Sequence, residues 1–176
     1  MKVRVYTDGA CLNNPGSGGW AVAFNMATKC ETIAGGESDV SNNRMELKAM
    51  IEAYKMALKK ANEINYDINV EIYTDSAYVV NSINNGWVDR WRFNEWRTTR
   101  NVVIKNRDLW EEFTELRSKT ARHININDIR VIKIKGHSGD TFNELVDKLA
   151  KREAMKIKSS CTTKWQNIKS EGGNLL

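Results

Sequence analysis

The chain has 176 residues, of which 41% are hydrophobic, and a formal net charge of +5. This length fits one globular domain with a sizeable core, and no run approaches the roughly 20 apolar residues of a membrane span. The three cysteines show no CxxC spacing, which favours reduced thiols over a disulfide framework. Because strand periodicity begins at Lys2, we expect no signal peptide and a cytoplasmic protein.

The first part of the chain predicts three strands and then a helix. Alternating apolar residues indicate strands over 2–8 and 20–26, and a third short strand is expected over 30–35. The turn-rich segment 13–19 separates the first two. From about Asn43, apolar residues recur at helical spacing. Three strands joined by short turns suggest an antiparallel meander.

The second part alternates strands and helices. The expected elements are a strand over 69–74, helices over 76–86 and 109–116, a strand over 129–135 and a final helix. Thr141 and Glu144 match a capping box that opens this last helix. The order predicts an α/β fold with a five-stranded mixed sheet, helices on both faces, and the first and fourth strands as parallel neighbours.

The composition becomes polar towards the C-terminus. Beyond Lys158 the chain is rich in Ser, Thr, Lys, Asn and Gly. We therefore expect one catalytic domain over 1–158 and a flexible tail over 159–176.

A repeated motif is the first sign of chemistry. Tyr6-Thr7-Asp8-Gly9-Ala10 returns as Tyr73-Thr74-Asp75-Ser76-Ala77, each time at the end of a predicted strand. If these strands are neighbours, the two carboxylates project from one face about 5 Å apart. Two like charges this close repel each other unless a cation lies between them. The repeat therefore predicts a metal site.

Two further acids can join this pair. Glu46 lies in the first turn of the long helix, aimed towards the sheet, and Asp147 lies in the last helix. Alone, each would be an ordinary helix acid. Four converging carboxylates suit Mg²⁺ or Mn²⁺, whereas no Cys–His spacing offers a zinc site and no P-loop is present.

A basic segment over about 87–107 suggests a polyanionic partner. Between Trp87 and Arg107 there are six cations and two acids, so the segment carries a net charge of +4. Aromatic residues interleave with these cations.

Five segments, taken in order, resemble ribonuclease H of type 1. They are Tyr6–Ala10, Asn42–Leu47, Tyr73–Ser76, Lys135–Gly139 and Asn143–Asp147, and the match runs over roughly residues 2–155. The resemblance implies an RNase H-like fold and hydrolysis of the RNA strand of RNA·DNA hybrids, which leaves 5′-phosphate and 3′-hydroxyl ends.

The resemblance also implies the catalytic residues. Asp8, Glu46, Asp75 and Asp147 would hold two Mg²⁺ ions, with Mn²⁺ as a substitute, and Asp8 would bridge both ions. His137 resembles the family's mobile histidine, which helps with proton transfer or product release.

Substrate-binding residues are assigned in the same way. Cys11, Asn14, Asn42 and Asn43 resemble the residues that read the minor groove, although the asparagines could instead only cap turns. Segment 87–107 resembles the family's basic handle, which grips the DNA strand. The handle and phosphate-pocket residues are Trp87, Arg92, Trp96 and Arg97, with Ser41 and Asn94 in the pocket. For Trp91, packing within the handle is the favoured interpretation.

Two alternatives remain open. The chain could be a non-catalytic hybrid-binding module, or another enzyme of the same fold such as an integrase, transposase or junction resolvase. Intact acids argue against the first, and the handle with the Gly-His-Ser-Gly loop argues against the second. We expect a monomer that binds RNA·DNA hybrids and no membrane.

Overall fold

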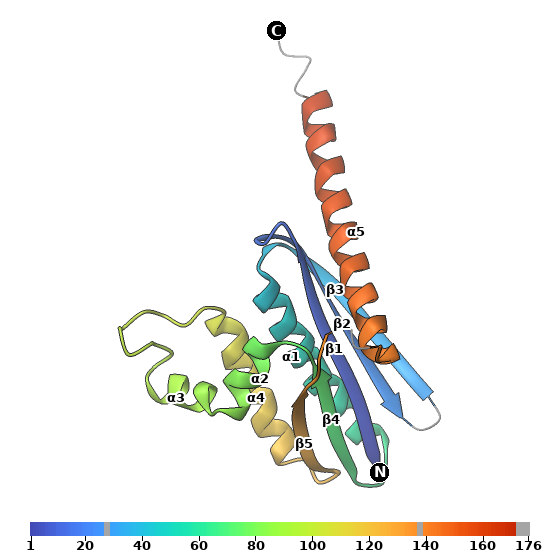
Figure 1. Ribbon diagram of the computed structural model, residues 1–176, viewed down its shortest axis with the longest axis vertical. Helices are drawn as coiled ribbons and strands as arrows, with labels where there is room; N and C mark the ends of the chain where they lie inside the picture. The colour runs from blue at the N-terminus through green and yellow to red at the C-terminus, as the bar shows by residue number, and fades with distance from the viewer. Residues whose placement is uncertain (27–28, 137–138, 172–176) are drawn as a thin grey trace.

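A five-stranded sheet forms the centre of the molecule (Figure 1). The computed structural model describes the backbone of residues 1–26, 29–136 and 139–171, and side chains in these ranges as far as Ser160. The strands are β1 (Lys2–Leu12), β2 (Gly16–Met26), β3 (Lys29–Val40), β4 (Ile68–Thr74) and β5 (Ile126–Lys133). Their order is β3-β2-β1-β4-β5, with antiparallel pairing among β1 to β3 and parallel pairing of β4 with β1 and β5. The predicted mixed sheet, with the first and fourth strands as parallel neighbours, is confirmed.

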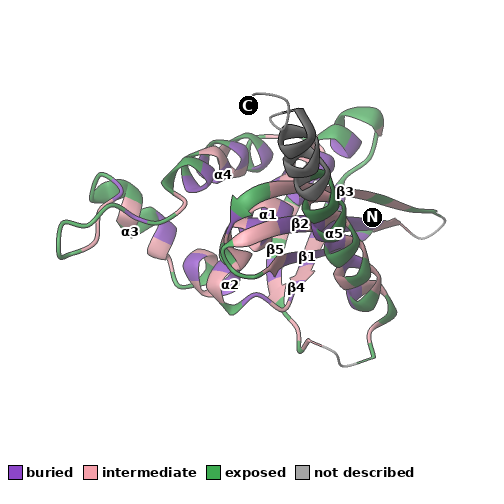
Figure 2. Ribbon diagram, turned by 90° about the horizontal axis from the view of Figure 1, so that it is seen from above, coloured by how far each residue is buried: buried purple, intermediate pink, exposed green. Residues whose placement is uncertain are grey.

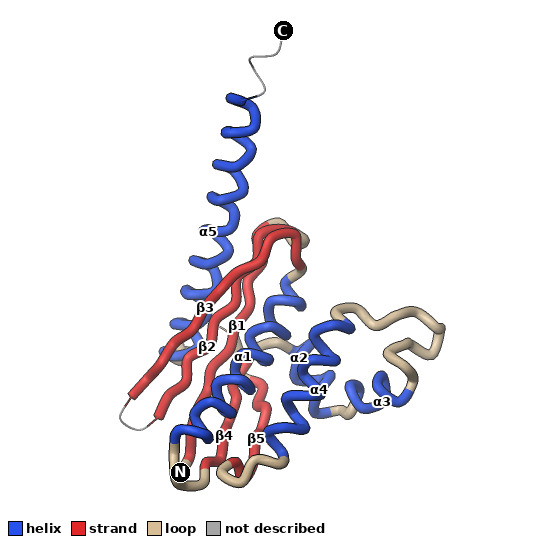
Figure 3. Tube along the Cα trace, turned by 180° about the vertical axis from the view of Figure 1, so that it is seen from behind, coloured by secondary structure: helices blue, strands red, loops and turns tan. Residues whose placement is uncertain are grey.

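The described part of the chain forms five helices, and the sheet has helices on both faces. They are α1 (Asn42–Glu63), α2 (Ala77–Asn84), α3 (Trp87–Phe93), α4 (Arg107–Ala121) and α5 (Thr141–Glu171). Helices α1 and α4 lie on one face and α5 lies on the other (Figure 3). Helix α3 and the loop after it protrude from the body (Figure 1). No described helix has a stretch long and apolar enough to cross a membrane.

The main core lies between α1 and the sheet (Figure 2). In β1, Val3 and Val5 are buried while Lys2 and Arg4 are exposed, as the alternation of side chains requires. From Tyr6 onward both faces of β1 become buried, because α5 covers the second face. The acid-bearing end of β1 is therefore the buried end.

The two helices that carry Glu46 and Asp147 begin at defined caps. The Ser41 hydroxyl accepts from the Arg44 amide at 3.3 Å at the start of α1. At the start of α5, Asp140 Oδ1 accepts from the amides of Phe142 and Asn143 at 3.0 and 3.1 Å. The cap is thus Asp140, and the expected capping box at Thr141 is wrong, because the first intrahelical bond runs from the Glu144 amide to the Asp140 carbonyl oxygen at 2.9 Å and the helix begins one residue earlier than that box requires.

Helix α5 continues beyond the expected end of the domain at Lys158. Its backbone is helical to Glu171, so most of the expected tail over 159–176 has helical backbone. The domain boundary and the flexibility of this segment stay predictions, and the side chains after Ser160 lie outside the described residues.

Candidate active site

Parallel pairing of β1 and β4 brings the two copies of the repeated motif side by side. Tyr6 is the register partner of Tyr73, so the segments that follow them end at the same edge of the sheet. A pocket of about 320 Å³ at this edge is lined by Asp8, Asp75, Glu46 and Asp147. The four predicted acids therefore come together from β1, the end of β4, α1 and α5.

Gly9 allows Glu46 to approach Asp8. A Cβ atom at Gly9 would lie 2.2 Å from the Glu46 backbone nitrogen and 2.4 Å from the Met45 carbonyl carbon. Only a residue without a side chain permits this contact between β1 and the first turn of α1. Gly136, in the segment after β5, allows a similarly close approach of the backbone to Asp75. A Cβ atom at Gly136 would lie 2.6 Å from Asp75 Oδ2.

The pocket is electrostatically unfavourable for carboxylates alone. Asp8 is 9% exposed. Burial, followed by the charges of Asp75 and Asp147, raises the pKa of Asp8 to about 8. Burial also raises the pKa of Glu46, although a hydrogen bond from Ser76 acts against this. A cation in the pocket would relieve both effects.

Two of the acids have protein partners in this structure. Glu46 accepts from Ser76 Oγ at 2.5 Å and from Asn42 Nδ2 at 2.8 Å. Asp147 accepts from Lys151 Nζ at 2.7 Å, and Lys151 also lines the pocket. Within the described part of the chain, no three Asp, Glu, His or Cys side chains already surround a single ion position. The acids share a pocket, but their oxygens do not yet converge on one point.

The donor set nevertheless fits a divalent cation with oxygen ligands. All four of the acidic side chains that line the pocket are carboxylates, the ligands that Mg²⁺ and Mn²⁺ prefer. The buried Asp8 needs a positive charge nearby to ionise at neutral pH.

The predicted groove-reading residues lie next to this pocket. Cys11 and Asn42 line it. The Cys11 thiol donates to the Val40 carbonyl oxygen at 3.0 Å. Asn14 Oδ1 accepts from the Asn42 amide at 3.1 Å, while Asn43 is exposed. Asn14 therefore does cap the start of α1, and a role in substrate binding stays a prediction for all four residues.

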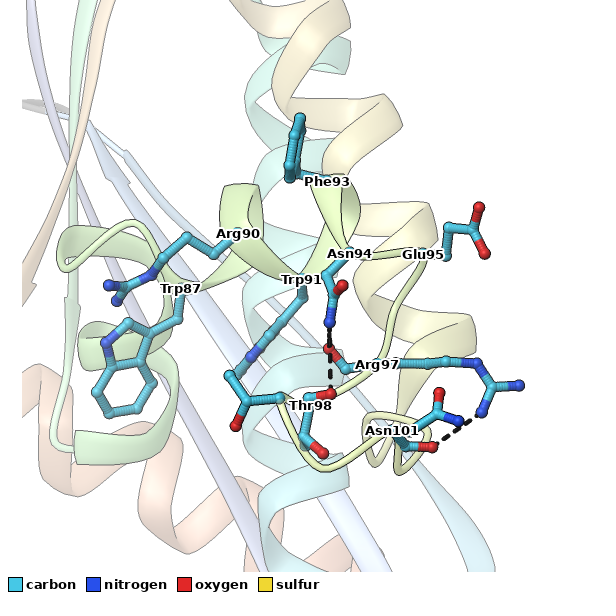
Figure 4. Close-up of a pocket in the computed structure, with 10 residues that line it drawn as sticks. Trp87, Arg90, Trp91, Phe93, Asn94, Glu95, Arg97, Thr98 and Asn101 are labelled. Atoms are coloured by element: carbon cyan, nitrogen blue, oxygen red, sulfur yellow. Dashed lines mark hydrogen bonds between the residues drawn. The ribbon is translucent and has the colours of Figure 1, made fainter.

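The predicted handle surrounds a pocket of about 960 Å³ (Figure 4). Trp87 and Trp91 point to one side of α3 and Phe93 points to the other. Trp91 packs edge-on against Trp110, with ring centroids 5.6 Å apart, which confirms packing for Trp91. The exposed apolar ring of the handle is that of Phe93, which is 93% exposed.

The other handle residues differ in how accessible they are. Trp96 is only 8% exposed and belongs to the core, although it lines a pocket together with Arg92, and its part in substrate binding stays a prediction. Arg92 is exposed, whereas Arg97 donates to the Asn101 carbonyl oxygen at 3.0 Å. Asn94 Nδ2 donates to the Arg97 carbonyl oxygen at 2.7 Å. Asn94 thus holds the turn after α3 together.

Of the predicted site residues, His137 lies outside the described residues. Sequence patterns missed three others that the structure places at the site. Ser76 binds Glu46, Lys151 pairs with Asp147, and Asp140 caps the helix that carries Asp147. The four-residue spacing of Asp147 and Lys151 is the one signal that the sequence offered for these contacts.

Comparisons with known proteins identify the family of this chain. The chain matches the RNase H family over residues 1–155. Ribonuclease H from Acetivibrio thermocellus is 44% identical over 155 residues, which cover 88% of this chain and 96% of that protein. Ribonuclease H from Syntrophomonas wolfei is 42% identical over 155 residues, covering 88% and 97%.

Solved structures share the fold. LC9-RNase H1, described as a type 1 RNase H with the type 2 active-site motif, aligns with a TM-score of 0.67 at 26% identity, covering 89% of this chain and 73% of that one. LC11-RNase H1 in complex with RNA/DNA hybrid aligns with a TM-score of 0.63 at 18% identity, covering 88% and 97%. With relatives above 40% identity along nearly their whole length, the chain belongs to the ribonuclease H family.

Proposed function

We propose that this protein hydrolyses the RNA strand of RNA·DNA hybrids in the pocket formed by Asp8, Glu46, Asp75 and Asp147, with Mg²⁺ as its metal. The observation that carries the proposal is the convergence of these four acids, from four separate elements, in one pocket. The solved structure of LC11-RNase H1 in complex with RNA/DNA hybrid supports the substrate class.

Divalent ions are required in the ribonuclease H family. Bound at the four acids, two such ions would stabilise the charge that develops on the scissile phosphate and on the attacking and leaving oxygens. The chain's own part is to hold the acids in place. Glu46 would turn from Ser76, and Asp147 from Lys151, to bind metal.

The surroundings of the pocket suit a nucleic acid duplex. Asn42, Asn14 and Cys11 lie beside the acids, where they would contact the minor groove and its 2′-hydroxyl groups. Helix α3 of the basic handle protrudes from the body that carries the sheet (Figure 1), and the arginines of the handle would bind phosphates of the DNA strand. Hybrid binding would therefore use two separate surfaces.

Cleavage assays test the proposal directly. Labelled RNA·DNA hybrid, duplex RNA and duplex DNA are each incubated with the protein in Mg²⁺ or in EDTA. We expect cleavage of the RNA strand of the hybrid only, with 5′-phosphate ends, and none in EDTA. Preferential cutting of duplex RNA, or cutting that persists in EDTA, would overturn the proposal.

The variant Asp8→Asn separates catalysis from binding. It keeps the shape of the side chain but removes the charge that a metal needs. We expect cleavage to fall at least about 1,000-fold while hybrid binding in Ca²⁺ changes less than about 3-fold. If the variant cleaves normally, Asp8 is no metal ligand. If the variant no longer binds hybrid in Ca²⁺, Asp8 is needed for the folded structure or for substrate binding, and the loss of cleavage cannot be assigned to metal binding.

A further inference from the structure

Three aromatic rings connect the elements that carry three of the four acids. The rings of Tyr6 and Tyr73 stack with centroids 5.0 Å apart and an angle of 18° between their planes. The ring of Phe142 stacks on Tyr6 with a centroid distance of 5.3 Å and an angle of 24°. We call these three residues the aromatic ladder.

Each ring of the aromatic ladder lies close in sequence to an acid. Tyr6 precedes Asp8 by two residues on β1, and Tyr73 precedes Asp75 by two residues at the end of β4. Phe142 lies in the first turn of α5, the helix that carries Asp147. A movement of any ring would therefore displace the acid on the same element.

The ladder lies where the backbone stops holding the two strands together. Tyr6 and Tyr73 form the last register pair between β1 and β4 before the acids. Beyond this pair, the repulsion among Asp8, Asp75 and Asp147 acts to separate the strand ends. The stacked rings thus form a side-chain link between β1 and β4 at the last register pair before the acids.

The ladder also connects α5 to β4. The most extensive contacts of α5 with the sheet are with β1, β2 and β3, and Figure 3 shows the helix on that side of the sheet. Phe142 reaches Tyr6, and Tyr6 reaches Tyr73. In addition, burial and the nearby charge of Asp140, the residue that caps α5, raise the pKa of the Tyr6 hydroxyl.

The hydroxyl of Tyr73 makes a further contact outside the aromatic ladder. The Tyr73 hydroxyl donates to Glu71 at 2.6 Å, and Glu71 in turn pairs with Lys2 at 2.7 Å. Tyr73 is half-buried, so it adds less to the core than a fully buried residue would. Core packing alone therefore explains the defined orientation of Tyr73 less well than a role in holding the end of β4 against β1.

We infer that Tyr6, Tyr73 and Phe142 are positioning residues that fix the spacing of Asp8, Asp75 and Asp147 for divalent cations. The inference rests on the proposed function of the four acids as metal ligands. It explains why tyrosine precedes the acid at the same position in both copies of the repeated motif. A flat ring on each strand lets the two side chains stack in register.

Titration of metal-free protein with Mn²⁺ alone, without substrate, tests the inference. We expect Tyr73→Ala to weaken Mn²⁺ binding about 10-fold, as substitutions behind metal ligands commonly do. Tyr73→Phe keeps the stacked ring and should restore binding to within about 2-fold of the wild type. Affinity for the hybrid in Ca²⁺-free buffer with EDTA should be the same for all three proteins.

The matched control is Ile33→Ala on β3. Ile33 is also half-buried and packs against the core, but it lies two strands away from β1. The melting temperatures of Ile33→Ala and Tyr73→Ala are measured first. The Mn²⁺ affinity of each variant is then measured at the same number of degrees below its own melting temperature. If Tyr73→Ala does not fold, Tyr73→Leu replaces it, because leucine keeps apolar volume without a flat ring.

Two outcomes would overturn the inference. One is Mn²⁺ binding by Tyr73→Ala that matches Ile33→Ala. The other is Tyr73→Phe with a defect as large as that of Tyr73→Ala, which would assign the effect to the hydroxyl. Wild-type protein that neither binds Mn²⁺ nor cleaves hybrid would instead refute the proposed function.

Discussion

Arg44 donates from both terminal guanidinium nitrogens to the Asp108 carboxylate, at 3.0 and 2.7 Å, and so joins the first turn of α1 to the first turn of α4. Arg44 also lies 3.4 Å from Glu37 on β3. The start of α1 carries Glu46 and Asn42, while α4 directly follows the handle. One guanidinium group therefore connects the acid pocket with the base of the handle.

We predict a measurable coupling between these two residues. Because both are partly exposed, solvent screening limits the free energy of interaction to about 1 kcal/mol despite the bidentate geometry. A double-mutant cycle with Arg44→Ala and Asp108→Ala, followed by urea denaturation, measures it. Coupling below about 0.3 kcal/mol, or coupling that is unchanged in 1 M NaCl, would contradict the prediction.

A pH dependence follows from Asp8. Its pKa in the folded, metal-free protein is about 8, well above the ordinary value of 3.8. Between these two values the folded state binds the proton more tightly than the unfolded state, so the free energy of unfolding falls as pH rises. Below pH 4 both states are protonated and the penalty is absent.

The variant Asp8→Asn should remove this slope. In EDTA, we expect it to be about 1–3 kcal/mol more stable than the wild type at pH 8 and equally stable at pH 4. Urea denaturation across this range gives the comparison. Adding Mg²⁺ should stabilise the wild type and leave the variant nearly unchanged. A wild-type stability that rises from pH 4 to pH 8 relative to the variant would be the opposite result.

Gly9→Ala should disrupt the site from the backbone side. The new Cβ meets backbone atoms of Met45 and Glu46 at 2.2–2.4 Å, which no side-chain rotation can relieve. We expect a loss of at least about 2 kcal/mol in stability and weaker Mg²⁺ activation, because α1 must move away from β1. Gly86→Ala is the control: a Cβ there meets nothing within 4 Å, although its φ of 66° adds strain. Equal Mg²⁺ activation in the two variants would argue against the prediction.

The handle should determine how hybrid binding depends on salt. Replacing Arg92 and Arg97 with Gln removes up to two phosphate contacts, so the slope of log K against log [salt] should become shallower by about 1–2. Because Arg97 is partly engaged with the Asn101 carbonyl, Arg92→Gln alone should account for most of the change. Lys59→Gln with Arg130→Gln, both exposed residues away from the handle, is the charge-matched control. An identical slope in the two double variants would exclude this role.

Local patterns were enough to predict the sheet and the acids. Alternation in β1 and the helical spacing of α1 reflect burial on one face, which a single sequence reveals. The order of the predicted elements made the first and fourth strands parallel neighbours, and the register of Tyr6 with Tyr73 confirms this. The alternation and the helical spacing depend only on residues close in sequence, and the strand neighbours follow from the order in which the elements come.

Contacts between distant elements could not be predicted in this way. Arg44 and Asp108 are 64 residues apart, and no periodic pattern in the sequence predicts that they form a pair. The same holds for the burial of Trp96, since an aromatic residue among arginines looks the same in sequence whether it faces water or the core. At the start of α5, two adjacent residues could both cap the helix, and only the backbone geometry chose Asp140.

The position of Asp147 in the last helix has a consequence for synthesis of the protein. Asp8 lies in the first strand and Asp147 in α5. Of these two acids, which share one pocket, Asp8 is therefore synthesised early in translation and Asp147 late. A nascent chain on the ribosome holds an incomplete set until α5 has emerged and packed against β1. We expect the nuclease to stay inactive beside the messenger RNA that encodes it until nearly the whole domain has been released.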